Sequence, residues 1–472
     1  MDFSEQTEAL PTMRRATLRE LILFASGGIG TGLIYVFLLR FAGSFFETFL
    51  NISPGQVAIL VLVPRLIDAF TDPIMGAWCD RHVTRFGRFR PYIQHGVYLM
   101  GASLVFLFID WGATPTLGLV LAYVFYIFNQ VISTVVKVPY LSSLALLTED
   151  PKQRTLAVSL KFSLSNLLII PVMAVIGEVI QRNAENGSNL NIYLYVAMVL
   201  AVVLVLAMNL VGRSLKRADT KEYWDKQPRQ EGAVSPWTGF KDMGLTLWRN
   251  KPLLLLAIAT GTDFLAFGAL SNALVYYFRF NVGDASLLGP YSLLTGIVWI
   301  VSCLCVTPVA NRFGRKNTYL VITILNIFVS CTLMWIPYTN ITLIFVQAGL
   351  TAFLQGFSAV LLWTILADCI DYDLWKNRER SEGVSTAAIE FINKFGSSFG
   401  AAIFYAIVLP AGYIAVSAEI PNPLQPESAK TAITSVLSVL PAAAYVCSLV
   451  AFLFFPIDRN LVLTIRKDLG RN

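Results

Sequence analysis

The chain has 472 residues, of which 56% are hydrophobic and only 14% are charged, and its mean hydropathy is +0.62. Because soluble domains carry about 25% charged residues, this composition excludes an ordinary water-soluble enzyme. The net charge of +6 comes from basic residues in short segments between apolar runs, which indicates membrane orientation rather than a nucleic-acid surface. Six cysteines without paired spacing and only two histidines argue against a disulfide framework or a histidine-based metal centre, and we expect no cofactor.

Apolar runs, taken in chain order, predict an all-α polytopic membrane protein with twelve transmembrane helices. The runs lie at about 20–48, 55–80, 91–111, 116–147, 155–180, 191–212, 252–280, 287–311, 317–337, 341–370, 384–414 and 431–456. The only long polar stretch is about 213–250. It predicts a cytoplasmic linker between an N-terminal six-helix bundle, residues 1–212, and a C-terminal six-helix bundle, residues 251–472.

A short internal repeat supports two related halves. The segment Asp80–Pro91, after the second run, has an echo in Asn311–Lys316, after the eighth run, and both contain the sequence Arg-Phe-Gly-Arg. Such a repeat predicts two bundles related by a pseudo-two-fold axis along the membrane normal.

The distribution of Lys and Arg predicts that both termini are cytoplasmic. The two termini and the even-numbered connections hold 28 of the 36 basic residues, whereas the other connections hold only Arg182, Arg279 and Lys430. Five basic residues remain inside the predicted spans, and intramembrane charges of this kind mark functional sites by default. They are Arg40, Arg65, Lys137, Lys161 and Lys394.

The second run carries two carboxylates that predict a cation site. Asp68 and Asp72 are four residues apart, hence on one helix face, and Asp68 lies near the middle of the bilayer. Two carboxylates cannot both stay ionised there without a cation or a proton, and Pro73 frees the carbonyl oxygen of residue 69 as a further ligand. We therefore predict that this site binds Na⁺ or H⁺. Arg65, three residues before Asp68, is a candidate coupling residue. The alternative is that it simply neutralises one carboxylate.

Further charges lie in the fourth, fifth and eleventh runs. Glu390 and Lys394 are again four residues apart, which fits either an ion pair within the helix or a Lys394 that faces the carboxylates of the second run. Lys137 and Lys161 have no acidic residue one helical turn away. Lys161 lies close enough to a span end to snorkel, whereas Lys137 lies deeper, and the nearby Tyr140 adds an amphipathic ring beside it.

Charges at the inner end of the tenth run predict a gate. Asp368 and Asp371 are followed by Arg378. We expect this segment to form ion pairs with basic loops of the first half, such as the loop of Arg88, in one conformation only. A solvated cytoplasmic face is an equal alternative.

Several motifs together identify a family. They are Asp68-x-x-x-Asp72-Pro73-x-x-Gly76-x-x-x-Asp80, Gly87-Arg88-x-Arg90-Pro91, Leu366-Ala367-Asp368 with Asp371-Tyr372, and Lys394-x-Gly396-Ser397-x-x-Gly400. In these motifs, and over essentially the whole chain, the sequence resembles the glycoside-pentoside-hexuronide:cation symporters, the melibiose permease group of the major facilitator superfamily. The resemblance implies the major facilitator fold. It also implies that Thr71 joins the two carboxylates in the cation site and that Lys394 is the family's coupling lysine.

The sugar-binding positions depart from this family's pattern. Where melibiose-type members carry Asp in the first and fourth spans, this chain has Gly32 and Lys137, and Lys161 stands where an Arg is expected. These changes make the predicted cavity more positive, which favours an anionic substrate such as a uronide or a sulfonated sugar. The substrate-binding candidates are Gly32, Lys137, Tyr140, Lys161 and Glu390.

The sequence therefore predicts a secondary active transporter and not an enzyme. We expect a symporter in the bacterial cytoplasmic membrane that acts as a monomer, binds no nucleic acid, and couples Na⁺ or H⁺ to a sugar-like solute by alternating access. A lipid or lysolipid carrier of the same fold is the alternative. An integral membrane enzyme is less favoured, because the chain lacks a His-rich motif and a nucleotide-binding Walker loop.

We predict that a reporter fused after Asn472 stays silent if it is active only outside the cytoplasm, because the basic residues place this end of the chain inside. The measurement is reporter activity in intact cells. A matched fusion after Gly187, in the connection between the fifth and sixth runs, should be active. Activity of the Asn472 fusion would overturn the span count.

Overall fold

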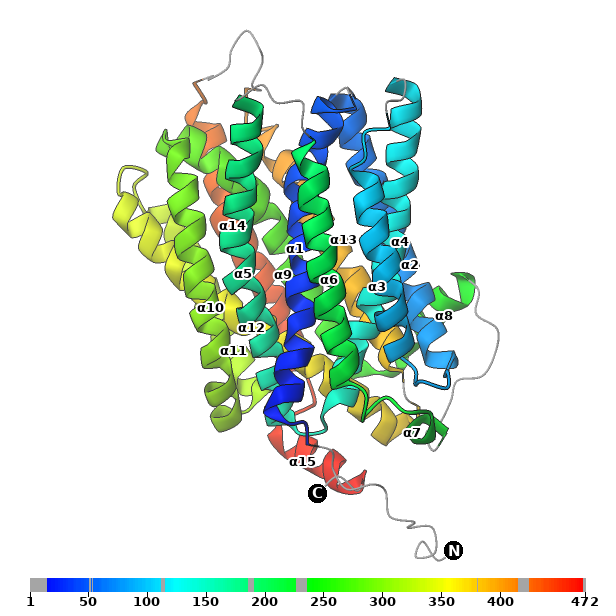
Figure 1. Cartoon of the computed structure of the whole chain (residues 1–472). Helices are drawn as coiled ribbons and strands as arrows, with labels where there is room; N and C mark the ends of the chain where they lie inside the picture. Colours follow the sequence, from blue (N-terminus) through cyan, green and yellow to red (C-terminus); the bar gives the residue numbers. More distant parts are fainter. Residues whose placement is uncertain are drawn as a thin grey trace, which may run out of the picture. The chain divides into compact units, whose positions relative to one another are not determined.

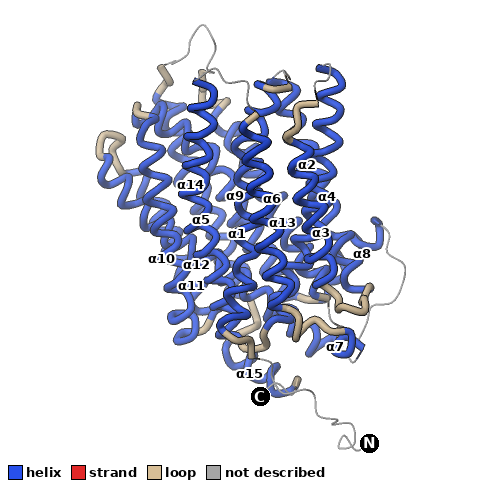
Figure 2. Tube along the Cα trace, in the orientation of Figure 1, coloured by secondary structure: helices blue, strands red, loops and turns tan. Residues whose placement is uncertain are grey.

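The computed structural model describes residues 15–50, 52, 54–111, 115–185, 191–225, 236–379, 381–414 and 424–469. Helices dominate this part of the chain, and it contains no strand (Figure 2). Twelve of its helices have 18 or more residues, which confirms the predicted all-α class. They are α1 Leu18–Thr48, α2 Pro54–Arg81, α3 Arg90–Leu107, α4 Pro115–Leu147, α5 Pro151–Glu185, α6 Ile192–Ser214, α9 Lys251–Tyr276, α10 Leu288–Phe313, α11 Arg315–Thr332, α12 Ile341–Asn377, α13 Glu382–Val408 and α14 Glu427–Leu453.

Among the described residues, nine helices are long and apolar enough to cross a membrane. The other three of the twelve long helices are α2, α3 and α13. Both α2 and α13 carry intramembrane charges that the sequence singled out, namely Asp68 and Asp72 in α2 and Glu390 and Lys394 in α13. Two of the three helices that are less apolar thus carry candidate functional charges.

Shorter helices lie in the connections. They are α7 Lys221–Asp225, α8 Pro236–Arg249, α15 Arg459–Asp468, the π-helix η1 Tyr277–Val282 and the 3₁₀ helices η2 Ala285–Leu287 and η3 Leu333–Trp335. The polar stretch 213–250 was expected only as a linker. Two of these helices, α7 and α8, lie within it, because amphipathic segments can fold against a neighbouring helix without being apolar throughout.

The chain forms two compact units. The first comprises Met1–Arg249, Ala367–Ala388 and Leu463–Asn472, and the second comprises Asn250–Leu366 and Ile389–Val462. As a result, α12 and α13 each have residues in both units. The predicted division into 1–212, 213–250 and 251–472 stays a prediction.

In the first unit, α1 packs against α5 and α6, α3 packs against α4 and α6, and α2 packs against α4 and α8. Figure 1 shows α1 and α6 side by side and α8 beside α2. Small residues permit these close approaches. A Cβ atom at Gly27 of α1 would lie 2.8 Å from ring atoms of Tyr140 in α4, so a larger residue at position 27 would displace that ring.

The second unit repeats the pairing of its first and third helices with its sixth, because α9 and α11 both pack against α14. Its α9 also crosses α13 closely. A Cβ atom at Gly261 would lie 2.8 Å from the side chain of Ile392, and one at Gly396 would lie 2.5 Å from the carbonyl oxygen of Gly261. The recurrence of the same pairing in the two units is what the internal sequence repeat led us to expect.

A buried carboxylate caps the start of α3. Phe89 stands at the cap position but supplies no side-chain hydrogen bond. Instead, Asp219, from the segment after α6, accepts hydrogen bonds from the backbone N–H groups of Arg88, Phe89 and Arg90 at 2.7, 2.8 and 2.6 Å. The indole of Trp224 donates to the same carboxylate at 2.7 Å. A negative charge at a helix N-terminus is favourable, so Asp219 ties the segment after α6 to α3.

Replacing this carboxylate should destabilise the protein. We expect Asp219→Ala to lower the free energy of unfolding by about 2–3 kcal/mol, because buried N–H groups lose a charged acceptor. The measurement is the melting temperature of the purified protein in detergent. Asp225→Ala, which removes an exposed carboxylate nearby, is the matched control. Equal melting temperatures for the two variants would contradict the capping role.

Candidate functional site

The carboxylates predicted to bind a cation are buried between α2 and α4. Asp68 is 7% exposed and Asp72 is 1% exposed. The hydroxyl oxygen of Thr134 in α4 lies 2.6 Å from Asp68 Oδ1 and 3.2 Å from Asp72 Oδ1. The Thr71 hydroxyl donates to the backbone carbonyl of Asp68 at 2.9 Å and lies 3.1 Å from the hydroxyl of Thr134. Two carboxylates and two hydroxyls are thus grouped around one point.

Thr134 is a member of this group that the sequence did not reveal. It is 2% exposed and lies 66 positions from Asp68 along the chain, so no local spacing connects the two residues. A single Thr in an apolar helix is too common to be a signal. Arg65 also lies in α2, but its side chain is outside the described part of the structure. Its predicted roles, in coupling or in neutralising a carboxylate, therefore stay predictions.

Oxygen atoms are the appropriate donors for a hard cation such as Na⁺. The group offers them from the side chains of Asp68, Thr71, Asp72 and Thr134, and α2 contains Pro73, which leaves the carbonyl of residue 69 without its helical hydrogen bond. Among the described residues, no cluster of three or more His, Cys, Asp or Glu side chains could hold a metal ion. The group thus suits a monovalent cation or a proton better than a transition metal.

The two lysines predicted to bind substrate lie near aromatic rings. The ammonium of Lys137 in α4 lies 5.7 Å from the ring centre of Tyr35 in α1. The ammonium of Lys161 in α5 lies 4.9 Å from the ring centre of Phe162 and 5.7 Å from that of Tyr140. Both lysines are half-buried. Their positive charges and the neighbouring ring faces are therefore contributed by α1, α4 and α5.

Tyr140 and Gly32 lie where α1 packs against α4 and α5. The hydroxyl of Tyr140, which is 1% exposed, donates to the backbone carbonyl of Phe24 in α1 at 3.1 Å. In this arrangement the Tyr140 ring supports Lys161, while its hydroxyl is engaged by α1. A Cβ atom at Gly32 would lie 2.6 Å from the side chain of Ile169 in α5, so the absence of a side chain lets α1 and α5 approach.

Arg88, predicted to be a gating residue, lies in a buried charge cluster at the end of α2. Its guanidinium forms ion pairs with Asp80 and with Glu382 at the start of α13, the latter at 3.1 Å. Its Nε donates to the carbonyl of Cys79 at 2.6 Å, and the Trp224 ring centre lies 4.5 Å from its guanidinium carbon. Because the three charged side chains are at most 3% exposed, their charges depend on one another for neutralisation.

The same cluster holds the start of α13. Asp80 accepts hydrogen bonds from the backbone N–H groups of Gly383 and Val384 at 2.9 and 2.8 Å. The backbones of α2 and α13 touch here, since a Cβ atom at Gly76 would lie 2.6 Å from the carbonyl oxygen of Gly383. The family motif in α2 therefore has a physical explanation: Gly76 permits the contact and Asp80 caps the helix.

A second charge cluster joins α5 to the end of α12. Arg154 forms an ion pair with Asp371, and its guanidinium lies 3.9 Å from Asp368. It also donates to the backbone carbonyls of Thr148 and Ala145. The structure thus places both predicted acidic gating residues against one arginine. The sequence did not single out Arg154, because a basic residue near the start of a helix is an ordinary feature.

The predicted gating role of Arg378 stays a prediction. It has a left-handed backbone with φ 58°, is exposed, and makes no ion pair with any described residue. Arg249, at the end of α8, lies 3.2 Å from Asp373 and 2.5 Å from Glu379 instead. Burial lowers the pKa of Arg249, but hydrogen bonds and the charges of these carboxylates outweigh it, so that the pKa is raised.

Glu390 and Lys394 lie on the part of α13 that belongs to the second unit, and both are half-buried. Their predicted roles in substrate binding and coupling stay predictions, because Asp68 and Asp72 belong to the first unit. A further acid of the second unit is Asp263 in α9. Its Oδ2 accepts a hydrogen bond from the Tyr319 hydroxyl at 3.3 Å.

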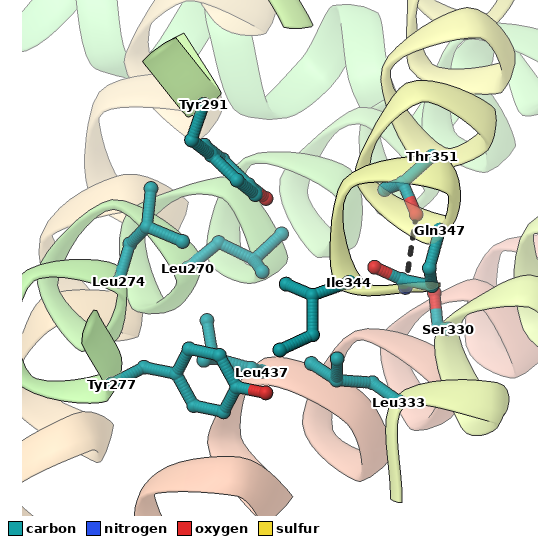
Figure 3. A pocket seen from close by; sticks show the side chains of 10 residues that line it. All are labelled: Leu270, Leu274, Tyr277, Tyr291, Ser330, Leu333, Ile344, Gln347, Thr351 and Leu437. Carbon is teal, nitrogen blue, oxygen red and sulfur yellow. Dashed lines mark hydrogen bonds between the residues drawn. The ribbon is translucent and has the colours of Figure 1, made fainter. Parts of the chain in front are cut away.

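The second unit also contains a small pocket between α9, α10, α11, α12 and α14 (Figure 3). Its volume is about 20 Å³, which holds about one water molecule and no sugar. Figure 3 shows the polar ends of Tyr291 and Gln347 turned toward the same space, with Gln347 Nε2 donating to Thr351 at 3.2 Å. This pocket is therefore not a candidate for the substrate site.

Sequence relatives cover nearly the whole chain. The isoprimeverose transporter of Lactiplantibacillus pentosus is 28% identical over 88% of this chain and 84% of its own length. A glucuronide carrier protein homolog of Escherichia coli is 23% identical and covers 93% of this chain and 92% of its own length. A putative glycoside/cation symporter of the same organism is 24% identical, with coverage of 97% and 96%.

A solved structure has the same fold. The crystal structure of FucP, a major facilitator superfamily transporter in the outward conformation, superposes with a TM-score of 0.65 at 13% identity and covers 93% of this chain and 98% of its own. A profile for the family described as MFS/sugar transport protein matches residues 23–459. These matches confirm the major facilitator fold and a transporter rather than an enzyme. The chain belongs to the MFS/sugar transport protein family.

Proposed function

We propose that this transporter is a cation-coupled symporter of an anionic sugar or sugar derivative. In the arrangement that we propose, it lies in the cytoplasmic membrane of a bacterium with both termini inside. The observation that carries the proposal is the cluster of Asp68, Asp72 and Thr134. Relatives named as a glycoside/cation symporter and a glucuronide carrier support the same class of function.

The proposed cation binding follows from how close the two carboxylates lie to each other. Asp68 Oδ1 and Asp72 Oδ1 both lie within hydrogen-bonding distance of one Thr134 oxygen, so the two carboxylates are within about 6 Å of each other. The Thr134 hydroxyl has one hydrogen to donate. This hydroxyl is neutral, so binding of Na⁺ or H⁺ relieves the repulsion between the carboxylates. Because the ligands come from α2 and α4, binding of the cation also favours the arrangement in which these helices are close.

Two lysines and the aromatic rings beside them support the proposed binding of an anionic substrate. Lys137 and Lys161 contribute two positive charges to the first unit, and each ammonium lies within 6 Å of an aromatic ring centre. Aromatic faces suit the apolar faces of a sugar ring, while ammonium groups suit a carboxylate or sulfonate on the same molecule. We therefore place the acidic group of the substrate near Lys137 and Lys161.

Neutralising one carboxylate should abolish accumulation of the substrate against its gradient without abolishing substrate binding. We expect Asp72→Asn to abolish uptake against a concentration gradient, because the altered site no longer binds the driving cation, whereas exchange of substrate across the membrane survives. The measurement is uptake and counterflow of a labelled glucuronide in vesicles with an imposed Na⁺ or H⁺ gradient. Asp284→Asn, in an exposed connection, is the control. Accumulation by Asp72→Asn with unchanged ion dependence would remove this residue from the cation site.

Removing the deeper lysine should change substrate preference. Lys137→Ala is expected to weaken binding of an acidic sugar by roughly 5- to 150-fold, because a charge-assisted contact contributes on the order of 1–3 kcal/mol. Binding of a matched neutral hexoside should change much less. The measurement is the affinity of the purified protein for a uronide and a hexoside, with Arg40→Ala as a control that removes an exposed cation of α1.

The same pair of ligands tests the alternative role of Lys137. If this lysine serves as an internal counter-charge for Asp68 or Asp72, its loss alters ion dependence and leaves the preference for the acidic sugar unchanged. An equal loss of affinity for both ligands would rule out the proposed anion site.

A further inference from the structure

The helix α8, Pro236–Arg249, has an apolar face that the transport function does not use. Trp237 is 80% exposed, Trp248 is 82% exposed and Leu245 is 55% exposed. With 3.6 residues per turn, the two tryptophans, 11 positions apart, differ by only about 20° around the helix axis. Leu245 lies about 80° from Trp237 on the adjoining side of the same face. Two large indole rings are thus presented in one direction.

The opposite face of α8 is fixed to α2. Gly239 and Thr246, which lie about 180–200° from Trp237, are both buried. A Cβ atom at Gly239 would lie 2.9 Å from the carbonyl oxygen of Pro73 in α2. Asp242 forms an ion pair with Arg81 at 2.6 Å. The exposure of the tryptophans is therefore a consequence of how α8 docks, and not of a helix without contacts.

The short link between α8 and α9 indicates where α8 lies relative to the bilayer. Only Asn250 separates α8 from α9, Lys251–Tyr276, which is one of the helices long and apolar enough to cross a membrane. The end of α8 therefore lies within one residue of the start of a membrane-spanning helix. On α2, the contacts of α8 range from Phe70, whose ring centre lies 5.8 Å from that of Phe240, to Arg81 at the helix end. The link to α9 and the ion pair with Arg81 at the end of α2 place the C-terminal part of α8 at the boundary between hydrocarbon and water.

The composition of the exposed face suits this boundary. Trp is enriched where lipid headgroups meet acyl chains, because its ring is apolar and its N–H donates a hydrogen bond. Lys241, about 40° from Trp237 around the helix, is exposed on the same face. The stretch 213–250 contains eight Lys and Arg residues, and a basic segment of this kind is attracted to anionic lipids.

We propose that α8 is an interfacial helix whose Trp237, Leu245 and Trp248 insert among the headgroups of anionic phospholipids, at the membrane surface where α9 begins. The helix lies along this surface with its opposite face on α2. Because Gly239 contacts Pro73, the residue after Asp72, α8 packs against the part of α2 that carries the carboxylates. This proposal does not depend on which solute or coupling ion the protein carries.

The test uses the full-length protein in bilayers of phosphatidylethanolamine and phosphatidylglycerol. Emission of Trp237 and Trp248 is obtained as the difference between the wild type and the Trp237→Phe/Trp248→Phe variant. We expect this difference emission to be lost when the phosphatidylglycerol is brominated near its headgroup, and to be unaffected by iodide in the water. Emission lost to iodide and retained with brominated lipid would overturn the proposal, and would indicate a face open to water or to a soluble protein.

Three further variants serve as controls for this test. If the double variant does not fold, the single variants Trp237→Phe and Trp248→Phe give the same difference signal one ring at a time. Trp224→Phe is the matched control, because Trp224 is 2% exposed and packs against Arg88. Its difference emission should be insensitive to brominated lipid. The quenching requires no transport, so its result stands apart from the tests of cation coupling.

Discussion

Charge buried away from water must be neutralised within the protein, and the cluster of Arg88, Asp80 and Glu382 meets this constraint where the end of α2 contacts the start of α13. Removing one partner from such a buried group costs about 3–5 kcal/mol, because the remaining charge is left uncompensated. The cluster therefore fixes its members together. Through Asp80 it also holds the start of α13, and through Arg88 it contacts Trp224, which in turn donates to Asp219. Helices from distant parts of the sequence thus share one electrostatic network.

Asp68 and Asp72, in the proposed cation site, are also buried carboxylates whose charges must be neutralised. At Arg88 the countercharges are other side chains, whereas Asp68 and Asp72 are grouped with hydroxyls from Thr71 and Thr134. Side-chain countercharges are permanent, but a cation from solution comes and goes. The charges around Arg88 neutralise one another within the protein, whereas the proposed cation site adds an ion from solution. The two lie on the same helix, because Asp68, Asp72 and Asp80 are all in α2.

Periodicity and apolarity in the sequence predicted the elements well, and the contacts between them poorly. Each predicted span has its helix, and the i, i+4 spacing of Asp68 and Asp72 was enough to place both carboxylates on one face. Thr134, Arg154 and Asp219 were missed because their partners are 66, 217 and 131 positions away and share no local pattern. For α8, the spacing of Trp237 and Trp248 was a usable signal, but the polar residues around them favoured a linker.

The continuity of α12 and α13 has a mechanical consequence. Two units joined only by loops can turn against each other at almost no enthalpic cost, since loops change their dihedral angles freely. Here two unbroken helices also have residues in both units, and neither contains a proline. Proline is the usual site of a sharp kink, so α12 and α13 both lack that kink site where they pass from one unit to the other. A bend within either helix disturbs helical backbone hydrogen bonds, a cost that a flexible loop does not carry.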